Sequence, residues 1–585
     1  MSKKHKQPKE KKHEKKHEHK EDSIIEQKSE LKPETPKKDK LSFKNKLING
    51  GILFVILVAF SLMAVFMTQK VLEPTNLGNI LPANQTVAFA TIDTSELSTK
   101  TTLPETYSLN PANLEQTIAG YFDQESFDLL KDWFNSQVAV ALMMGTSQEI
   151  EKTYFFEYQD RNTALKFLES ITTEGEAVNK ENYGSYTIYS YSLSQNFSAA
   201  LIANYLVISE DTDMLKLIID TAEGDASSLK SLSAYNTVMD NLPYDATGVV
   251  FWNVKLYPDL AASYIPIYDI IPEALITPVM AIFTGFGAVI QATPEGFYIQ
   301  TYTSVDTNLL EDLSYFGFVK KYNANLTAYI PDGPTMFFGG EDIQGEVKKA
   351  VSIFKKFNES AAIIFEGVLR GAAKQYFGEN IDLEADIYPV LEDEYSISVY
   401  QGDDGVKNYL VLIDLQNQSD KQIHIDTLNQ GFLEQQIYSE PYVKTYTLED
   451  GSEGKEIVAD LAEILNEKIT YGDSTIDMFY LSNGDTLGYT AVSHDKFAMA
   501  TDLDLLKQSL DLMSDATTGS FADSENMDAV SAIMGSADEA SLMDINSMRD
   551  SSEFWGVEFF SPFSQISSSK NFFDDGVATF HMLKY

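Results

Sequence analysis

Histidine is the usual general base of hydrolases, and only three histidines, His424, His494 and His581, lie beyond residue 46 of this 585-residue chain. A Ser–His–Asp site needs a histidine that an acid orients toward an activated serine. His424 falls in a helical pattern, His494 in a turn and His581 in the last strand pattern, and no Gly-x-Ser-x-Gly elbow is present. We therefore expect structural histidines, and we assign no catalytic residue.

Carboxylates are the other groups that could do chemistry, because a suitably spaced pair can hydrolyse a glycosidic bond. With 87 acidic residues, any pair chosen from sequence would be arbitrary. Two pairs recur at matching positions, Asp211/Asp213 and Asp502/Asp504, and each stands where a helical pattern begins. Aspartate there accepts hydrogen bonds from unpaired N–H groups and interacts favourably with the helix dipole, so we interpret both pairs as helix caps.

The sequence predicts no cofactor and no metal site. The absence of cysteine excludes disulfides, thiolate metal sites and thiol catalysis, and beyond residue 46 there is neither a His-Glu-x-x-His motif nor a phosphate-binding glycine loop. Three acidic clusters, Gln401–Gly405, Leu448–Gly454 and Phe572–Gly576, lack the full ligand order of a calcium loop. We expect them to be turns, with weak calcium binding left as an alternative.

The element that would position the rest of the chain is Leu47–Thr68, which no charge interrupts between Lys46 and Lys70. A hydrocarbon core needs about 20 mostly apolar residues, so residues 47–69 are predicted to be a transmembrane helix. The run is too long for a cleaved signal peptide and lacks a small-x-small cleavage site, which favours an uncleaved anchor. We therefore expect a single-pass protein with the lipid bilayer as its first partner.

Charge sets the predicted orientation. Residues 1–46 hold 16 Lys against 9 acidic residues, a net charge of +7, which leaves −50 for the rest of the chain. Lysines beside a membrane helix stay cytoplasmic, so the N-terminus is predicted inside and the large acidic region outside. The tail lysines are expected to contact anionic lipid, and nucleic acid is excluded as a partner of a region that repels phosphates.

The outer region contains an internal duplication. The clearest match sets Ile208–Ala222 beside Met499–Met513 at one offset of 291, and Ile80–Asp93 likewise resembles Tyr329–Asp342. The predicted organisation is a disordered basic tail (1–46), the transmembrane helix (47–69), a tether (70–78), a first α+β domain (79–310) and a second α+β domain with helical insertions (325–585).

The predicted fold class is α+β, with an antiparallel sheet and helices in each copy. Short β-branched and aromatic runs indicate strands, and Ser482–Asp485, which contains Asn-Gly, predicts a hairpin. Gly345–Phe377 and Lys455–Ile469 are extra material in the second copy. The uncharged run Ala274–Ala292 is interpreted as a buried helix leading into a strand, with a second membrane crossing or an apolar lip as alternatives.

The opening Leu-Pro, aliphatic strand and Asp of Ile80–Leu97, together with the later Asp-x-Asp-x-Leu-Lys helix, resemble a bacterial family, the domain of unknown function 3352. That resemblance implies an exported protein behind one N-terminal membrane segment. It implies no activity and no defined site.

We therefore expect a noncatalytic, extracytoplasmic binding or scaffolding protein of the bacterial cell envelope, whose partner is an unknown envelope protein or polymer. One alternative is a carboxylate-dependent hydrolase acting on a glycan-like polymer. The other is a lipid-handling protein with a deep apolar cavity beside Ala274–Ala292.

Overall fold

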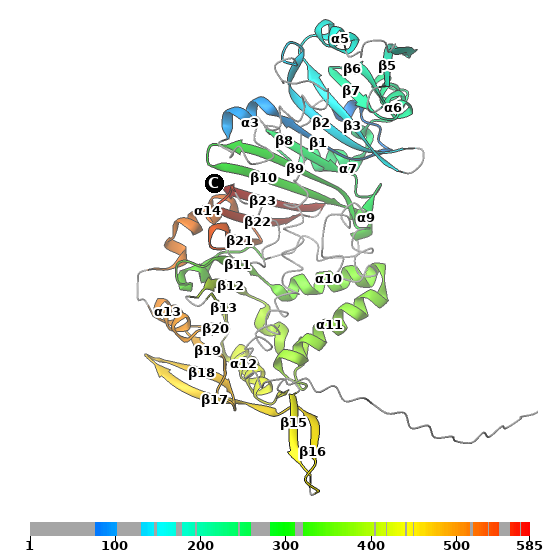
Figure 1. Ribbon diagram of the computed structural model, residues 1–585. Coiled ribbons are helices and arrows are strands. Elements are labelled where there is room, and N and C mark those ends of the chain that lie inside the picture. The colour runs from blue at the N-terminus through cyan, green and yellow to red at the C-terminus, as the bar shows by residue number, and fades with distance from the viewer. Residues whose placement is uncertain are drawn as a thin grey trace, which may run out of the picture. The chain divides into compact units, whose positions relative to one another are not determined.

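In the computed structural model, the described residues are 77–101, 130–145, 149–170, 178–192, 196–243, 246–258, 281–310, 320–402, 405–416, 418–438, 442–448, 450–514, 519–535, 537–548, 562–573 and 575–585 (Figure 1). The predicted tail (1–46) and transmembrane helix (47–69) lie outside them. Among the described residues, no helix is both long and apolar enough to span a membrane.

The described strands build one antiparallel sheet of 21 strands and a separate two-stranded hairpin. In the first half of the chain the strands pair in the order β4-β5-β6-β7-β3-β2-β1-β8-β9-β10. Their bounds are β1 Thr86–Asp93, β2 Phe134–Met144, β3 Ile150–Tyr158, β4 Asn179–Tyr183, β5 Tyr186–Ser192, β6 Asn196–Ile202, β7 Tyr205–Ser209, β8 Gly248–Trp252, β9 Phe283–Thr293 and β10 Gly296–Val305.

The second half repeats this order as β17-β18-β19-β20-β13-β12-β11-β21-β22-β23, and a short β14 is added beside β17. The bounds are β11 Met336–Glu341, β12 Glu394–Gln401, β13 Lys407–Asp414, β14 Gln436–Tyr438, β17 Leu461–Tyr471, β18 Ser474–Leu481, β19 Thr486–Ser493, β20 Lys496–Ala500, β21 Glu539–Asp544, β22 Gln565–Phe573 and β23 Gly576–Lys584. The hairpin is β15 (Tyr442–Thr447) and β16 (Glu453–Val458).

The two halves meet where β10 pairs with β23, so that they share one continuous sheet (Figure 1). The core continues across this junction, because Phe297 of β10 packs edge-on against Phe563 of the second half with ring centroids 5.9 Å apart. The α+β antiparallel fold class is confirmed. The division into domains 79–310 and 325–585 stays a prediction.

Helices lie between the strands in both halves. In the first half they are α2 (Leu77–Ile80), α3 (Thr94–Lys100), α5 (Arg161–Ser170), α6 (Thr212–Glu223), η3 (Leu229–Ser231), α7 (Ser233–Asp240) and α9 (Thr307–Leu310). In the second half they are η6 (Asn325–Tyr329), α10 (Ile343–Phe357), α11 (Glu359–Phe377), η7 (Leu383–Ile387), η8 (Tyr388–Leu391), α12 (Gln418–Leu433), α13 (Leu503–Met513), η9 (Phe521–Asp523), α14 (Glu525–Met534) and α15 (Ile545–Met548).

Helix α6 shows why these segments fold as they do. Leu215, Ile218 and Ile219 fall on one side of the helix and are fully buried in the core of the first half. Gly224 ends the helix with a left-handed φ of 90°, a conformation that glycine adopts without steric cost.

Helix α2 shows that the folded body begins earlier than predicted. A Cβ at Gly78 would lie 2.4 Å from the hydroxyl oxygen of Tyr235, so any larger residue there would force the buried tyrosine ring to shift. Leu77 beside it is buried in the core of the first half. Leu77 and Gly78, predicted as tether, therefore already belong to the folded body.

Other predictions can be compared with the structure. The Ser482–Asp485 hairpin is confirmed between β18 and β19. The insertion Gly345–Phe377 is helical, as α10 and α11, whereas Lys455–Ile469 forms parts of β16 and β17. A second membrane crossing by Ala274–Ala292 is contradicted in its described part, because β9 is hydrogen-bonded to β8 and β10 on its two edges.

Candidate functional site

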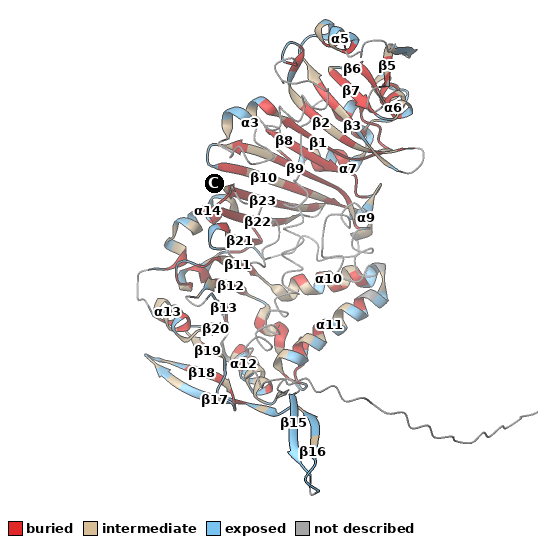
Figure 2. Ribbon diagram, viewed as in Figure 1, coloured by how far each residue is buried: buried red, intermediate tan, exposed pale blue. Residues whose placement is uncertain are grey.

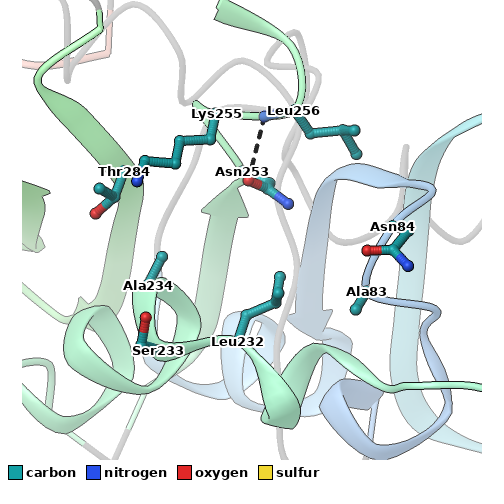
Figure 3. Close-up of a pocket in the computed structure, with 9 residues that line it drawn as sticks. All are labelled: Ala83, Asn84, Leu232, Ser233, Ala234, Asn253, Lys255, Leu256 and Thr284. Carbon is teal, nitrogen blue, oxygen red and sulfur yellow. Dashed lines mark hydrogen bonds between the residues drawn. The ribbon is translucent and has the colours of Figure 1, made fainter. Parts of the chain in front are cut away.

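A pocket of about 310 Å³ opens where four segments of the first half meet (Figure 3). The loop before β1, the start of α7, the segment after β8 and the strand β9 supply its walls. The lining residues are Ala83, Asn84, Leu232, Ser233, Ala234, Asn253, Lys255, Leu256 and Thr284. No carboxylate or imidazole is among these residues, so amides, hydroxyls and one ammonium group are the polar groups available to a ligand.

Several of these polar groups already form hydrogen bonds with other residues of the chain. The Lys255 ammonium donates to an Asp306 carboxylate oxygen at 2.7 Å, and this contact lowers the pKa of Asp306. The buried Asn253 side chain accepts from the Leu256 backbone N–H at 3.3 Å, the dashed line in Figure 3. The Thr284 hydroxyl lies 2.7 Å from that of Ser304. The pocket can hold a small polar group, and none of the nine lining residues described above is a carboxylate or imidazole that could activate a hydroxyl.

The three histidines lie on separate elements, as expected. His424 belongs to α12, and His494 occupies the turn between β19 and β20 with a φ of 47°. His581 lies in β23 with its Nδ1 2.7 Å from the Ser568 hydroxyl. Burial lowers the pKa of His581 to about 4, and only 1% of its surface is exposed. This Ser–His pair is therefore a core contact that a substrate does not reach.

The first aspartate of each recurring pair, Asp211 and Asp502, is a helix cap, as predicted. The Asp211 side chain accepts a hydrogen bond of 2.8 Å from the backbone N–H of Asp213. The Asp502 side chain accepts one of 2.8 Å from the backbone N–H of Leu505. Asp213 and Asp504 lie in the first turn of their helices, where a negative charge interacts favourably with the helix dipole.

The rest of this recurring motif also has a structural role, which the sequence analysis missed. The Lys216 ammonium lies 5.5 Å from the ring centre of Tyr183, whose hydroxyl donates to Asp220 at 3.1 Å. The second half repeats the arrangement with Lys507 at 5.8 Å from the ring of Tyr471, which donates to Asp511 at 2.9 Å. These contacts hold α6 against the end of β4 in the first half and α13 against the end of β17 in the second. A sequence signal existed, since Tyr-Gly occurs at 183–184 and at 471–472.

A buried charge cluster joins α10 to the sheet. The Lys570 ammonium donates to both carboxylate oxygens of Glu539 at 3.1 Å and lies 4.3 Å from the ring centre of Phe572. The Lys349 ammonium of α10 lies 5.2 Å from the centre of the same ring. It also lies 3.5 Å from a carboxylate oxygen of Glu346. Burial raises the pKa of Glu346. Each carboxylate faces an ammonium group, which is typical of a structural ion-pair network.

The acidic clusters connect adjacent strands, as predicted for turns. Gln401–Gly405 lies between β12 and β13, Leu448–Gly454 between β15 and β16, and Phe572–Gly576 between β22 and β23. Gly405 and Gly451 have positive φ values of 76° and 82°, which a glycine in a turn accommodates. Among the described residues, no three His, Asp or Glu side chains form a cluster that could hold a metal ion.

Comparison with known proteins gives one family match. A family described as "Protein of unknown function (DUF3352)" matches residues 46–441. A comparison with curated proteins finds no match. Among solved structures, crystal form I of TP0453 is similar over 43% of this chain and 87% of that chain, with 10% identity and a TM-score of 0.22, a value too low to assign a fold.

Proposed function

The chain belongs to the DUF3352 family of proteins of unknown function, and from this premise we propose a membrane-anchored, extracytoplasmic protein that binds or scaffolds a component of the bacterial envelope without catalysis. Its lipid partner would be the bilayer around residues 47–69, with the tail lysines at anionic headgroups. The family match includes Leu47–Thr68, the segment on which the anchor rests.

The observation that carries the noncatalytic part is the pocket. Of its nine lining residues, Lys255 is the one with an ionisable side chain, and that side chain is paired with Asp306. General acid–base catalysis needs a group that can give or take a proton at the substrate. The hydrolase alternative draws no support from this lining.

The scaffolding part of the proposal rests on an internal duplication. The two halves share their strand order, and an isolated bridge, Pro82 with Ser228, recurs as Pro331 with Ser520. We infer that one ancestral unit was copied and fused through β10 and β23. A continuous sheet of this kind holds distant surfaces in a fixed relation, which suits a scaffold.

Topology can be tested with single cysteines, because the chain has none of its own. Asp473 lies exposed in the turn between β17 and β18, whereas Ser2 belongs to the basic tail. A membrane-impermeant maleimide added to intact cells should label Asp473→Cys but label Ser2→Cys only after lysis. The reverse pattern would contradict the proposal.

A second measurement addresses catalysis. The purified full chain is incubated with isolated cell-wall glycan, and the supernatant is assayed for new reducing ends. We expect none above the level of a heat-treated sample. Release that grows with protein concentration would favour the hydrolase.

A further inference from the structure

The pocket of the first half lies at the start of helix α7. Leu232, Ser233 and Ala234 line it, so the first turn of the helix faces the open space (Figure 3). The first N–H groups of a helix have no acceptor within that helix, and they carry a partial positive charge. Leu232, at the N-cap position, has no side-chain oxygen that could accept from them, and the first turn contains no acidic residue. The start of α7 is therefore able to bind an anionic group.

The side chain of Asn253 also points to a ligand. Asn253 directly follows β8, a strand that is buried along its whole length (Figure 2), and is itself only 7% exposed. Its side-chain oxygen accepts from the Leu256 backbone N–H, so the atom that points into the pocket is the amide nitrogen (Figure 3). This NH₂ group forms no hydrogen bond with any residue that the structure describes. Buried polar groups of native proteins almost always have a partner, and an acceptor on a bound molecule would supply one here.

Three other lining residues add hydrogen-bond donors. The Lys255 ammonium has three N–H bonds, and the Asp306 carboxylate accepts from it at 2.7 Å. The Ser233 hydroxyl and the Asn84 amide can each donate as well. Because Asp306 already balances the charge of the ammonium group, the pocket suits a ligand with one negative charge better than a ligand with two.

The second half offers an internal comparison. Helix α14 corresponds to α7, since each helix follows the recurring proline–serine bridge of its half. The start of α14 is capped by the chain itself, because the Met527 N–H donates to the Ser524 hydroxyl at 3.1 Å. Glu525, the first residue of α14, adds a carboxylate there. The second half thus supplies with its own side chains what the start of α7 lacks.

The position of Asn253 carries a carboxylate in the second half. Asp544 ends β21, and like Asn253 it accepts a hydrogen bond from the backbone N–H three residues later. The other carboxylate oxygen of Asp544 accepts from the Ser547 hydroxyl at 2.6 Å. Glu525 and Asp544 therefore stand where the first half has the uncharged residues Ser233 and Asn253.

We propose that the pocket binds the free carboxylate of a small polar molecule, with the start of α7 and the Asn253 amide donating to its oxygens. The bound group would take the place that acidic side chains occupy in the second half. This ligand class rests on the noncatalytic binding function proposed above and makes it specific. Hydrogen bonds to a charged carboxylate are stronger than those to a neutral acceptor, so the charge of the ligand should matter.

Binding can be measured on the purified full chain in a nonionic detergent. The probe is N-acetylglycine, which has one carboxylate, and the readout is saturation-transfer difference NMR with empty micelles as background. We expect saturable binding to the wild type, no binding of the methyl ester of the same compound, and little displacement by an equal concentration of inorganic phosphate. Absence of saturable binding, equal binding of the ester, or phosphate that binds more tightly than the probe would overturn the proposal.

A variant at the helix start tests the location of the site. Ser233→Glu places a carboxylate at the first position of α7 and should raise the dissociation constant of the probe about tenfold or more. The variant should remain as resistant to urea as the wild type, because an acidic residue is favourable at the start of a helix. Asn162→Glu, in the first turn of α5, is the matched control and should bind the probe like the wild type. Equal binding by the two variants would contradict the assigned site.

A second pair of variants tests the amide. Asn253→Asp keeps the acceptor for Leu256 but replaces the donor with a carboxylate, and it should weaken binding to a similar extent. Asp544→Asn makes the reverse change in the second half and should leave binding unaltered. Failure of the binding tests alone would overturn this proposal, whereas the cysteine labelling and the glycan assay decide topology and catalysis independently of the probe.

Discussion

Gln300 of β10 is the strand partner of Phe580 of β23, and each residue stands four positions after the glycine that begins its strand. A position in one half therefore pairs with the same position in the other. The register continues symmetrically, since Gly296 faces Lys584 while Ser304 faces Gly576. This is the geometry of a two-fold interface, here formed within one chain.

A side-chain bond across this junction gives the first prediction. The buried Tyr302 hydroxyl donates to Asp575 at 2.6 Å, joining β10 to the turn before β23. Tyr302→Phe should lower the free energy of unfolding by about 1–2 kcal/mol, because a hydrogen bond to a carboxylate is lost. Urea unfolding measures the change. In a double-mutant cycle with Asp575→Asn the two losses should not add; full additivity would mean that the bond contributes nothing.

Capping gives the second prediction. Asp502→Ala should destabilise the protein by about 1 kcal/mol, because the Leu505 backbone N–H loses its acceptor. Asp502→Asn should cost less, since asparagine is also a good cap. Asp504→Ala serves as the matched control and should change stability by about a few tenths of a kcal/mol, as it removes a charge near the helix dipole but no cap. Equal costs for Asp502→Ala and Asp504→Ala would contradict the capping assignment.

The buried charge cluster gives the third prediction. Lys570→Met leaves the Glu539 carboxylate buried without its ammonium partner, and we expect a loss of about 3–5 kcal/mol in thermal or urea unfolding. The double variant Glu539→Gln/Lys570→Met should recover most of that loss. Lys180→Met breaks an exposed pair with Glu169 and should cost less than about 1 kcal/mol.

Glu394 gives the fourth prediction. Burial raises its pKa to about 7, even though its carboxylate accepts hydrogen bonds from the Leu326 N–H and the Asn325 amide. In the unfolded chain the same carboxyl releases its proton near its ordinary pKa of 4.5. The folded state therefore binds more protons between these two pKa values, and the stability contribution is present below about pH 4.5 and lost as the pH rises through about 7.

The measurement is urea unfolding at pH 5 and pH 8. Relative to wild type, Glu394→Gln should remove about 2–3 kcal/mol of the decline in stability between these values. His581 contributes with the opposite sign, because burial lowers its pKa to about 4 and its contribution is lost as the pH falls. For this reason the comparison with the variant, rather than the wild-type profile alone, is decisive. Identical profiles for the two proteins would refute the assignment.

Sequence patterns correctly predicted the features that depend only on residues close together in the sequence. A cap needs an aspartate just before a helix, and the Ser482–Asp485 hairpin needs a tight turn, so both could be recognised locally. The strands in Lys455–Ile469 could not be recognised locally, because the Ala, Leu, Glu and Lys residues of this segment favour a helix. Pairing with β18 nevertheless makes Leu461–Tyr471 a strand. Non-local pairing decided the structure there.

The pocket was beyond prediction for the same reason. Asn84, Ser233, Asn253 and Thr284 are separated by up to two hundred residues and meet only when the sheet and α7 have assembled. None of them belongs to a motif, and an amide or a hydroxyl is common on any surface. No local pattern therefore distinguishes these four residues from the many like them.

Strand β23 lies in the middle of the sheet, between β10 and β22. While the chain is being synthesised, both of these strands have an open edge until residues 576–584 are available to pair with them. A variant that lacks residues 576–584 would keep both unpaired edges in one polypeptide, and such edges readily pair with other chains. Removal of this one strand should therefore produce an aggregating protein.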